Sequence, residues 1–256
     1  MISDLDESKA PLLDHLIELR TRLLWCVAAF ALAFAVSLYF AKPIFAILVQ
    51  PLLAAGQGKL IYTDIFEAFF AEIKVAFFAA MMVGFPVFAT QLYKFVAPGL
   101  YAKEKRAFLP FLLMTPVLFT AGAALAYYVA MPVALRFLLG YTGDVGGVAQ
   151  EALPGVGNYL TFVTKFVFGF GIAFLLPVVL MLLERAGIVT RDQLKSGRRY
   201  AIVGAFALAA VLTPPDIISQ VLLAVPLCLL YEFAILAIWF TQRRRAAAMK
   251  AEEVSG

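Results

Sequence analysis

Long apolar runs separated by short polar segments set the pattern of this chain. About 20 apolar residues in a helix, rising about 1.5 Å per residue, match the hydrocarbon core of a bilayer. The expected crossings cover residues 23–41, 69–89, 108–129, 159–183, 200–213 and 219–240. The pattern therefore predicts an all-α integral membrane protein with six transmembrane helices.

The fifth and sixth expected helices are short, and a helix-breaking segment separates them. Residues 212–216 read Leu-Thr-Pro-Pro-Asp, and two consecutive prolines end a helix because proline lacks an amide proton and clashes with the preceding turn. The fifth run reaches only about 21 Å, less than the roughly 30 Å of the hydrocarbon core. We therefore expect a hairpin with the Asp216 carboxylate at its tip, followed by the polar residues Ser219 and Gln220.

Composition and basic residues indicate the setting and the orientation. The chain is 63% hydrophobic and 15% charged over 256 residues, which is more apolar than a soluble domain of this size. Lys and Arg are retained on the cytoplasmic side during insertion. They concentrate before the first run, after the second and fourth runs, and after the sixth. We therefore expect both termini in the cytoplasm and the Pro214-Pro215 hairpin outside.

One polytopic membrane domain is expected to account for the whole chain. Its parts are a cytoplasmic amphipathic segment (1–22), a six-helix bundle (23–240) and a cytoplasmic tail (241–256). No cleavable signal is evident before the first run, which is expected to remain as an anchor. Cys26 and Cys228 both lie in apolar runs, where packing is favoured over a disulfide.

Motifs for catalysis are missing from the sequence. It contains no phosphate loop, no H-E-x-x-H and no G-x-S-x-G. His15 is the single histidine and cannot form a multi-histidine metal site. The sequence therefore predicts no enzyme, no metal site and no cofactor.

Acidic and basic residues near the N-terminus share one face of a predicted helix. Leucine and isoleucine recur at helical spacing after Pro11, while Asp14, Glu18 and Arg22 share another face. This pattern predicts an amphipathic helix that lies along the cytoplasmic surface and bends into the first crossing. An ion pair between Glu18 and Arg22 is the simpler role for this carboxylate.

Glu104 lies in the short loop between the second and third expected crossings. Pro98-Gly99 favours a turn there, which would leave Phe95 and Leu100 as an apolar rim beside the charge. A solvated carboxylate among basic residues is the alternative. A carboxylate beside such a rim suits a guanidinium followed by an apolar peptide.

Four separated segments resemble the hallmark motifs of the TatC family, the multispanning subunit of the twin-arginine protein translocase. They are His15-Leu-Ile-Glu-Leu-Arg20, Phe95-Val-Ala-Pro98, Leu100-Tyr101 with Glu104, and residues 212–220 around Pro214-Pro215. The resemblance implies a receptor for Arg-Arg signal peptides that supports proton-gradient-driven export of folded proteins across the bacterial cytoplasmic (inner) membrane. Implied partners are single-span proteins of the TatA and TatB kind, membrane lipid and further copies of the chain, with no role for nucleic acid.

The resemblance also implies residue roles. Glu18 and Glu104 would engage the two arginines. Arg20, Phe95 and Leu100 would shape the same site. Thr213, Asp216 and Gln220 would form a polar patch for partner helices. Structural roles are implied for Pro51, Pro98, Pro214, Pro215 and Glu232. One departure is Leu175, because the family commonly has an acidic or polar residue two positions before the corresponding proline, here Pro177.

Two other functions are weaker alternatives. A small secondary transporter or channel would need midplane charges and repeated halves, but the charges cluster toward the two faces and the halves show no duplication. Lys165 is a charge within an expected crossing, and snorkelling or pairing with Glu72 is favoured over a proton relay. An intramembrane enzyme lacks a nucleophile and base.

Overall fold

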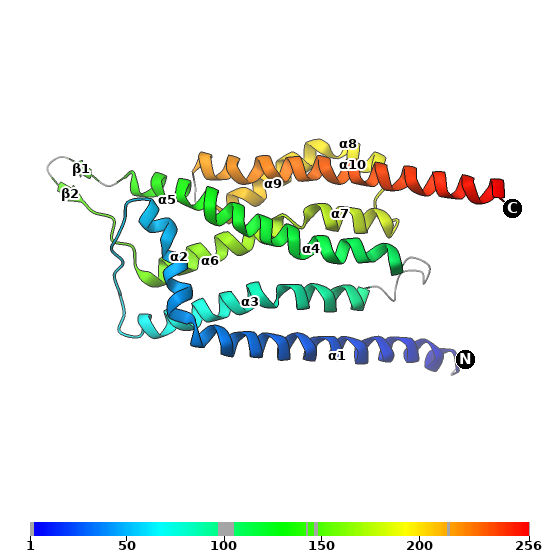
Figure 1. Cartoon of the computed structure of the whole chain (residues 1–256), viewed down its shortest axis with the longest axis horizontal. Coiled ribbons are helices and arrows are strands. Elements are labelled where there is room, and N and C mark those ends of the chain that lie inside the picture. Colours follow the sequence, from blue (N-terminus) through cyan, green and yellow to red (C-terminus); the bar gives the residue numbers. More distant parts are fainter. Residues whose placement is uncertain (1–2, 97–104, 142, 146–147, 214–215, 256) are drawn as a thin grey trace. The chain divides into compact units, whose positions relative to one another are not determined.

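The computed structural model describes residues 3–96, 105–141, 143–145, 148–213 and 216–255 (Figure 1). Five helical segments in these ranges are long and apolar enough to cross a membrane. They are His15–Tyr39, Glu67–Phe95, Leu112–Leu139, Val156–Arg185 and Ile217–Arg243. These segments coincide with the first, second, third, fourth and sixth expected crossings. The helical fold is confirmed, with one addition, an antiparallel pair of short strands, β1 (Gly143–Val145) and β2 (Val148–Gln150).

The chain divides into two compact units, and the first comprises residues 1–48 and 62–116. Its main elements are α1 (Ser3–Tyr39) and α3 (Glu67–Val96), which run side by side (Figure 1). Small residues at helical spacing on α3 are buried, namely Ala71, Val75, Ala76, Ala79 and Ala80. Small side chains allow close approach of neighbouring helices, which is a common basis of helix packing in membranes.

The bend expected near residue 22 is absent from helix α1. The helix is continuous over 37 residues, because neither proline nor glycine interrupts residues 12–39. Helix α2 (Ala41–Ala54) follows after one turn residue and was not predicted. Its 14 residues are too few for a crossing and include prolines, so neither length nor propensity pointed to a helix there.

The second unit comprises residues 49–61 and 117–256. Its first span joins the end of α4 (Lys105–Leu125), the π-helical turn η3 (Ala126–Ala130) and α5 (Met131–Leu139). Its second span consists of α6 (Val156–Ala173) and α7 (Leu176–Arg185). The two helices separate just before Pro177, which lies in the first turn of α7, because proline cannot continue the hydrogen-bond ladder.

Helices α4 and α6 approach closely in this unit. A Cβ at Gly122 would lie 2.7 Å from the backbone oxygen of Phe170, and one at Gly171 would lie 2.7 Å from the ring of Phe119. Both distances are shorter than ordinary van der Waals contacts. Glycine at position 122 therefore lets the α6 backbone approach α4, and glycine at position 171 leaves room for the Phe119 ring.

Three further helices complete the second unit. Helix α8 (Arg191–Ser196) begins with a capping box between Thr190 and Gln193, followed by α9 (Arg198–Leu212) and α10 (Ile217–Ser255). The fifth expected crossing corresponds to α9, whose 15 residues reach roughly 22 Å. Its passage across the membrane stays a prediction.

The prediction of a short sixth helix was wrong. Helix α10 contains 39 residues and continues through the segment expected to be a separate tail. The tail residues after Arg243 are mostly Arg, Ala, Met, Lys and Glu, which are strong helix formers. Nothing in the sequence stops the helix at the end of the apolar run.

Candidate functional site

Glu18 lies near the middle of α1, one turn after His15, which contacts the last turn of α3. Its side chain is 28% exposed, and its Oε1 accepts a hydrogen bond from Nη2 of Arg22 at 2.9 Å. The two residues are four apart, so consecutive turns of one helix bring them together. The ion pair expected as the simpler role of Glu18 is therefore present.

His15 connects this part of α1 to the end of α3. Its imidazole stacks on the Phe95 ring, with centroids 4.3 Å apart and planes inclined by 20°. His15 and Glu18 are three residues apart and so lie on one face of α1. The stack therefore brings Phe95, a predicted site residue, next to the turn that carries Glu18.

A hydrogen bond ties the same end of α3 to α4. The Tyr93 hydroxyl and Thr115 Oγ1 lie 3.0 Å apart, and Thr115 is buried. The loop between these helices carries Glu104, Leu100 and Pro98, all of which lie outside the described residues. The described contact joins the end of α3 to the middle of α4.

The remaining predicted peptide-site residue is Arg20, which is exposed on α1. It lies two positions from both Glu18 and Arg22 in the helix, so its side chain points away from their face. The site in the described residues thus consists of a half-buried carboxylate and an aromatic stack. This combination suits a cationic, planar group next to apolar side chains.

The residues predicted to form a patch for partner helices, Thr213, Asp216 and Gln220, lie in the second unit. The Asp216 carboxylate caps α10, because its Oδ1 accepts a hydrogen bond from the Ser219 backbone amide at 2.6 Å. Thr213 is buried and its hydroxyl donates to the Ala209 carbonyl at 2.8 Å. An aspartate before an apolar run is a recognisable helix start, yet sequence reasoning assigned Asp216 only to partner docking.

Two polar atoms at this helix start are buried without a hydrogen-bond partner among the described residues, namely Asp216 Oδ2 and Ser219 Oγ. Asp216 is only 2% exposed and Ser219 is fully buried. Buried polar atoms are normally paired. Pro214 and Pro215 precede them and lie outside the described residues.

Glu232 forms a two-bond ion pair that sequence reasoning missed. Arg198 Nη2 donates to Oε2 and Arg198 Nε contacts Oε1, each at 2.7 Å, which joins the start of α9 to α10. Next to it, the buried Tyr231 hydroxyl donates to the Leu194 carbonyl at 2.7 Å. Arg198 had been counted only among the basic residues that set orientation, and no local spacing connects residues 34 positions apart.

The other predicted positions have simpler surroundings. Pro51 is buried inside α2. Leu175 is half-buried at the junction before α7. Lys165 is exposed on α6. None of these observations assigns a ligand to the three positions.

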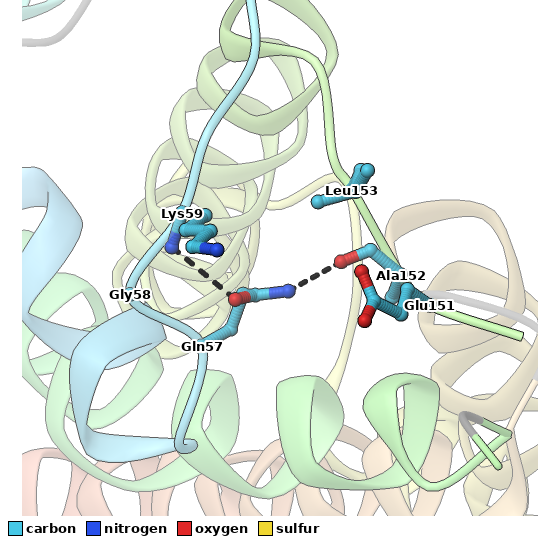
Figure 2. Close-up of a pocket in the computed structure, with 6 residues that line it drawn as sticks. All are labelled: Gln57, Gly58, Lys59, Glu151, Ala152 and Leu153. Carbon is cyan, nitrogen blue, oxygen red and sulfur yellow. Dashed lines mark hydrogen bonds between the residues drawn. The ribbon is translucent and has the colours of Figure 1, made fainter. Parts of the chain in front are cut away.

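A hollow of about 480 Å³ lies between the segment after α2 and the segment before α6. Figure 2 shows the Gln57 side chain reaching across it to donate a hydrogen bond to the Ala152 carbonyl. The same two segments are joined by the bond from the Val156 amide to the Ile61 carbonyl, at 2.9 Å. Among the described residues, no predicted site residue lines this hollow.

Comparisons with known proteins agree on one family. The model of the family "Sec-independent protein translocase protein (TatC)" matches residues 14–226. The TatC of Magnetococcus marinus is 47% identical over 96% of this chain and 90% of its own length. The Aquifex aeolicus protein is 41% identical over 94% of this chain and its whole length, and the Escherichia coli protein 38% identical over 90% and 88%.

Solved structures lead to the same family. The chain resembles "Crystal Structure of Twin Arginine Translocase Receptor- TatC" with a TM-score of 0.74 and 42% identity, covering 89% of this chain and 99% of that one. A second crystal structure of that receptor, in DDM, matches with the same TM-score and identity. The family model and the relatives each cover most of the sequence, so the chain belongs to the TatC family of Sec-independent protein translocase proteins.

Proposed function

We propose that this chain is the signal-peptide receptor and core subunit of a twin-arginine translocase, and that Glu18 and Glu104 bind the consecutive arginines of the peptide. The observation that carries the proposal is the half-buried Glu18 carboxylate one turn from the His15–Phe95 stack. A guanidinium forms two parallel bonds to a carboxylate, whereas an ammonium is a point charge. The site would therefore prefer Arg to Lys.

The aromatic stack would hold the residues that follow the arginines. Phe95 and Leu100 would form an apolar rim for the peptide, and exposed Arg20 would shape the approach to it. Hydrogen bonds to charged groups contribute about 1.5–3 kcal/mol each when both partners are present. Two arginine–carboxylate pairs would therefore account for most of the specificity, with apolar contacts adding affinity.

The membrane arrangement proposed for this function is a single polytopic domain with six crossings and both termini in the cytoplasm of a bacterial inner membrane. Helix α9 would be the fifth crossing, thinning the bilayer or using flanking residues to complete its span. The peptide site would then face the cytoplasm, where folded precursors are made. The proton gradient would supply the energy.

Single-span partners of the TatA and TatB kind would dock at the outer hairpin. Gln220 is half-buried on α10, next to the buried Ser219, so its amide would be available to a polar side chain of a partner helix. A cysteine at position 220 should form a disulfide with a cysteine in the partner's membrane helix. No crosslink at any partner position would reject this docking site.

The receptor function is tested by photo-crosslinking in membrane vesicles. An Arg-Arg signal peptide with a photoreactive residue next to the arginines should label the wild-type chain, and a Lys-Lys peptide should not. The Glu18→Gln/Glu104→Gln double variant should lose labelling while still inserting into the membrane. Glu151→Gln, which removes an exposed carboxylate elsewhere, should label as the wild type does. Full labelling of the double variant would reject the proposal.

A further inference from the structure

Glu18 already has a guanidinium partner in the structure. Arg22 donates from Nη2 to Oε1 of Glu18 at 2.9 Å, and the two side chains are 30% and 28% exposed respectively. Arg22 Nε is buried and has no hydrogen-bond partner among the described residues. The pair therefore uses one bond of the two that an arginine and a carboxylate can form.

We propose that Arg22 is a further residue of the peptide site, the resting partner of Glu18 that an arginine of the signal peptide replaces. This inference rests on the function proposed above. A bidentate arginine needs both oxygens of the carboxylate, and Arg22 occupies one of them. Two guanidinium groups at one carboxylate also repel each other. Binding of the peptide therefore requires Arg22 to move away.

The geometry allows Arg22 to leave. A partly exposed pair four residues apart on a helix is a weak interaction, which alters an equilibrium by only about two- to fivefold. Arg22 has the long, flexible stem of all arginines, so it can swing away without moving α1. Its one bond is exchanged for two bonds from the peptide, so the exchange favours the bound state.

The exchange sets affinity and leaves selectivity unchanged. Repulsion between two cations at one carboxylate acts on an ammonium as it does on a guanidinium, so either group must displace Arg22 to bind Glu18. The cost of displacement is then the same for an Arg-Arg and a Lys-Lys peptide. Removal of Arg22 should tighten the binding of both peptides by one factor, while the ratio of their dissociation constants stays the same.

The test is equilibrium binding of fluorescent Arg-Arg and Lys-Lys signal peptides to the purified full chain in nanodiscs. Arg22→Gln should bind both peptides about two- to fivefold more tightly than the wild type. Arg22→Lys, which keeps the charge but not the planar donor, should fall between the two. Arg199→Gln is the matched control, because it removes an equal charge from an exposed residue that bonds to the Tyr200 hydroxyl. It should bind as the wild type does.

The outcomes separate this inference from the function on which it rests. Unchanged or weaker binding by Arg22→Gln and Arg22→Lys, with weak binding by Glu18→Gln, overturns the role of Arg22 alone. Wild-type binding by Glu18→Gln overturns the assignment of Glu18 to the peptide site, and the role of Arg22 with it. Thermal melting of each variant identifies one that is unfolded, and either Arg22 variant suffices for the comparison.

Discussion

The imidazole of His15 stacks on the Phe95 ring, one turn of α1 away from the Glu18 carboxylate. Glu18 and Phe95 were assigned to one site from separated motifs, and the stack of His15 on Phe95 brings their helices together. That contact was not predictable, because nothing in the sequence gives the distance between residues 15 and 95. The bond between Glu18 and Arg22 was predictable, because helical spacing alone places residues four apart in contact.

Tyr231 gives the prediction at this scale. Its hydroxyl donates to the Leu194 carbonyl, and both residues are buried. Tyr231→Phe leaves that carbonyl without its side-chain partner and should destabilise the protein by about 1–3 kcal/mol. Tyr200→Phe, at a residue 66% exposed, should change stability by less than about 0.5 kcal/mol. Equal melting temperatures of the two variants in detergent would contradict the role of this hydrogen bond.

At the scale of helices, the apolar runs predicted correctly that most of the long helices exist, but they did not predict where the helices end. Helix α10 continues past the end of its run because charged helix formers follow, and α2 was missed because its run is shorter than a crossing. The close approach of α4 and α6 was also not predictable. A glycine inside an apolar run has the same sequence signal whether it faces a neighbouring backbone or open space.

Two glycines in the second unit test this packing. Gly122→Ala places a Cβ 2.7 Å from the Phe170 backbone oxygen, and it should destabilise the protein by about 1–3 kcal/mol because a backbone cannot move aside easily. Gly204→Ala has nothing within 4 Å of its Cβ. It should stabilise α9 by roughly 0.8–1 kcal/mol through helix propensity. Melting temperatures that shift in the same direction for both variants would contradict the packing account.

At the scale of the whole molecule, composition and hydropathy gave the class of protein, and the motifs gave the family. Five of the six expected crossings correspond to long apolar helices. The exception is the crossing expected at residues 200–213, because the corresponding helix α9 is shorter than a usual membrane span. The number of crossings was predicted from the apolar runs. The side of each terminus was predicted from the distribution of Lys and Arg, which acts during insertion.

Labelling of single cysteines tests that topology. In a background with Cys26→Ala and Cys228→Ala, cysteines at positions 58 and 217 should react with an impermeant maleimide from outside intact cells. A cysteine at position 199 should react only after the membrane is opened, because α9 would separate 199 from 217. Labelling of 199 and 217 from the same side would show that α9 does not cross.

The most direct test of the central claim is the ratio of dissociation constants of Lys-Lys and Arg-Arg signal peptides, measured for the wild type and for Glu18→Gln. A bidentate pair that ammonium cannot reproduce, worth about 1.5–3 kcal/mol, predicts a wild-type ratio of at least roughly tenfold, because 1.4 kcal/mol corresponds to a factor of ten. Glu18→Gln should bind the Arg-Arg peptide more weakly and lose much of this ratio. A variant that keeps both the affinity and the ratio of the wild type would contradict the account, because the guanidinium would then be recognised elsewhere.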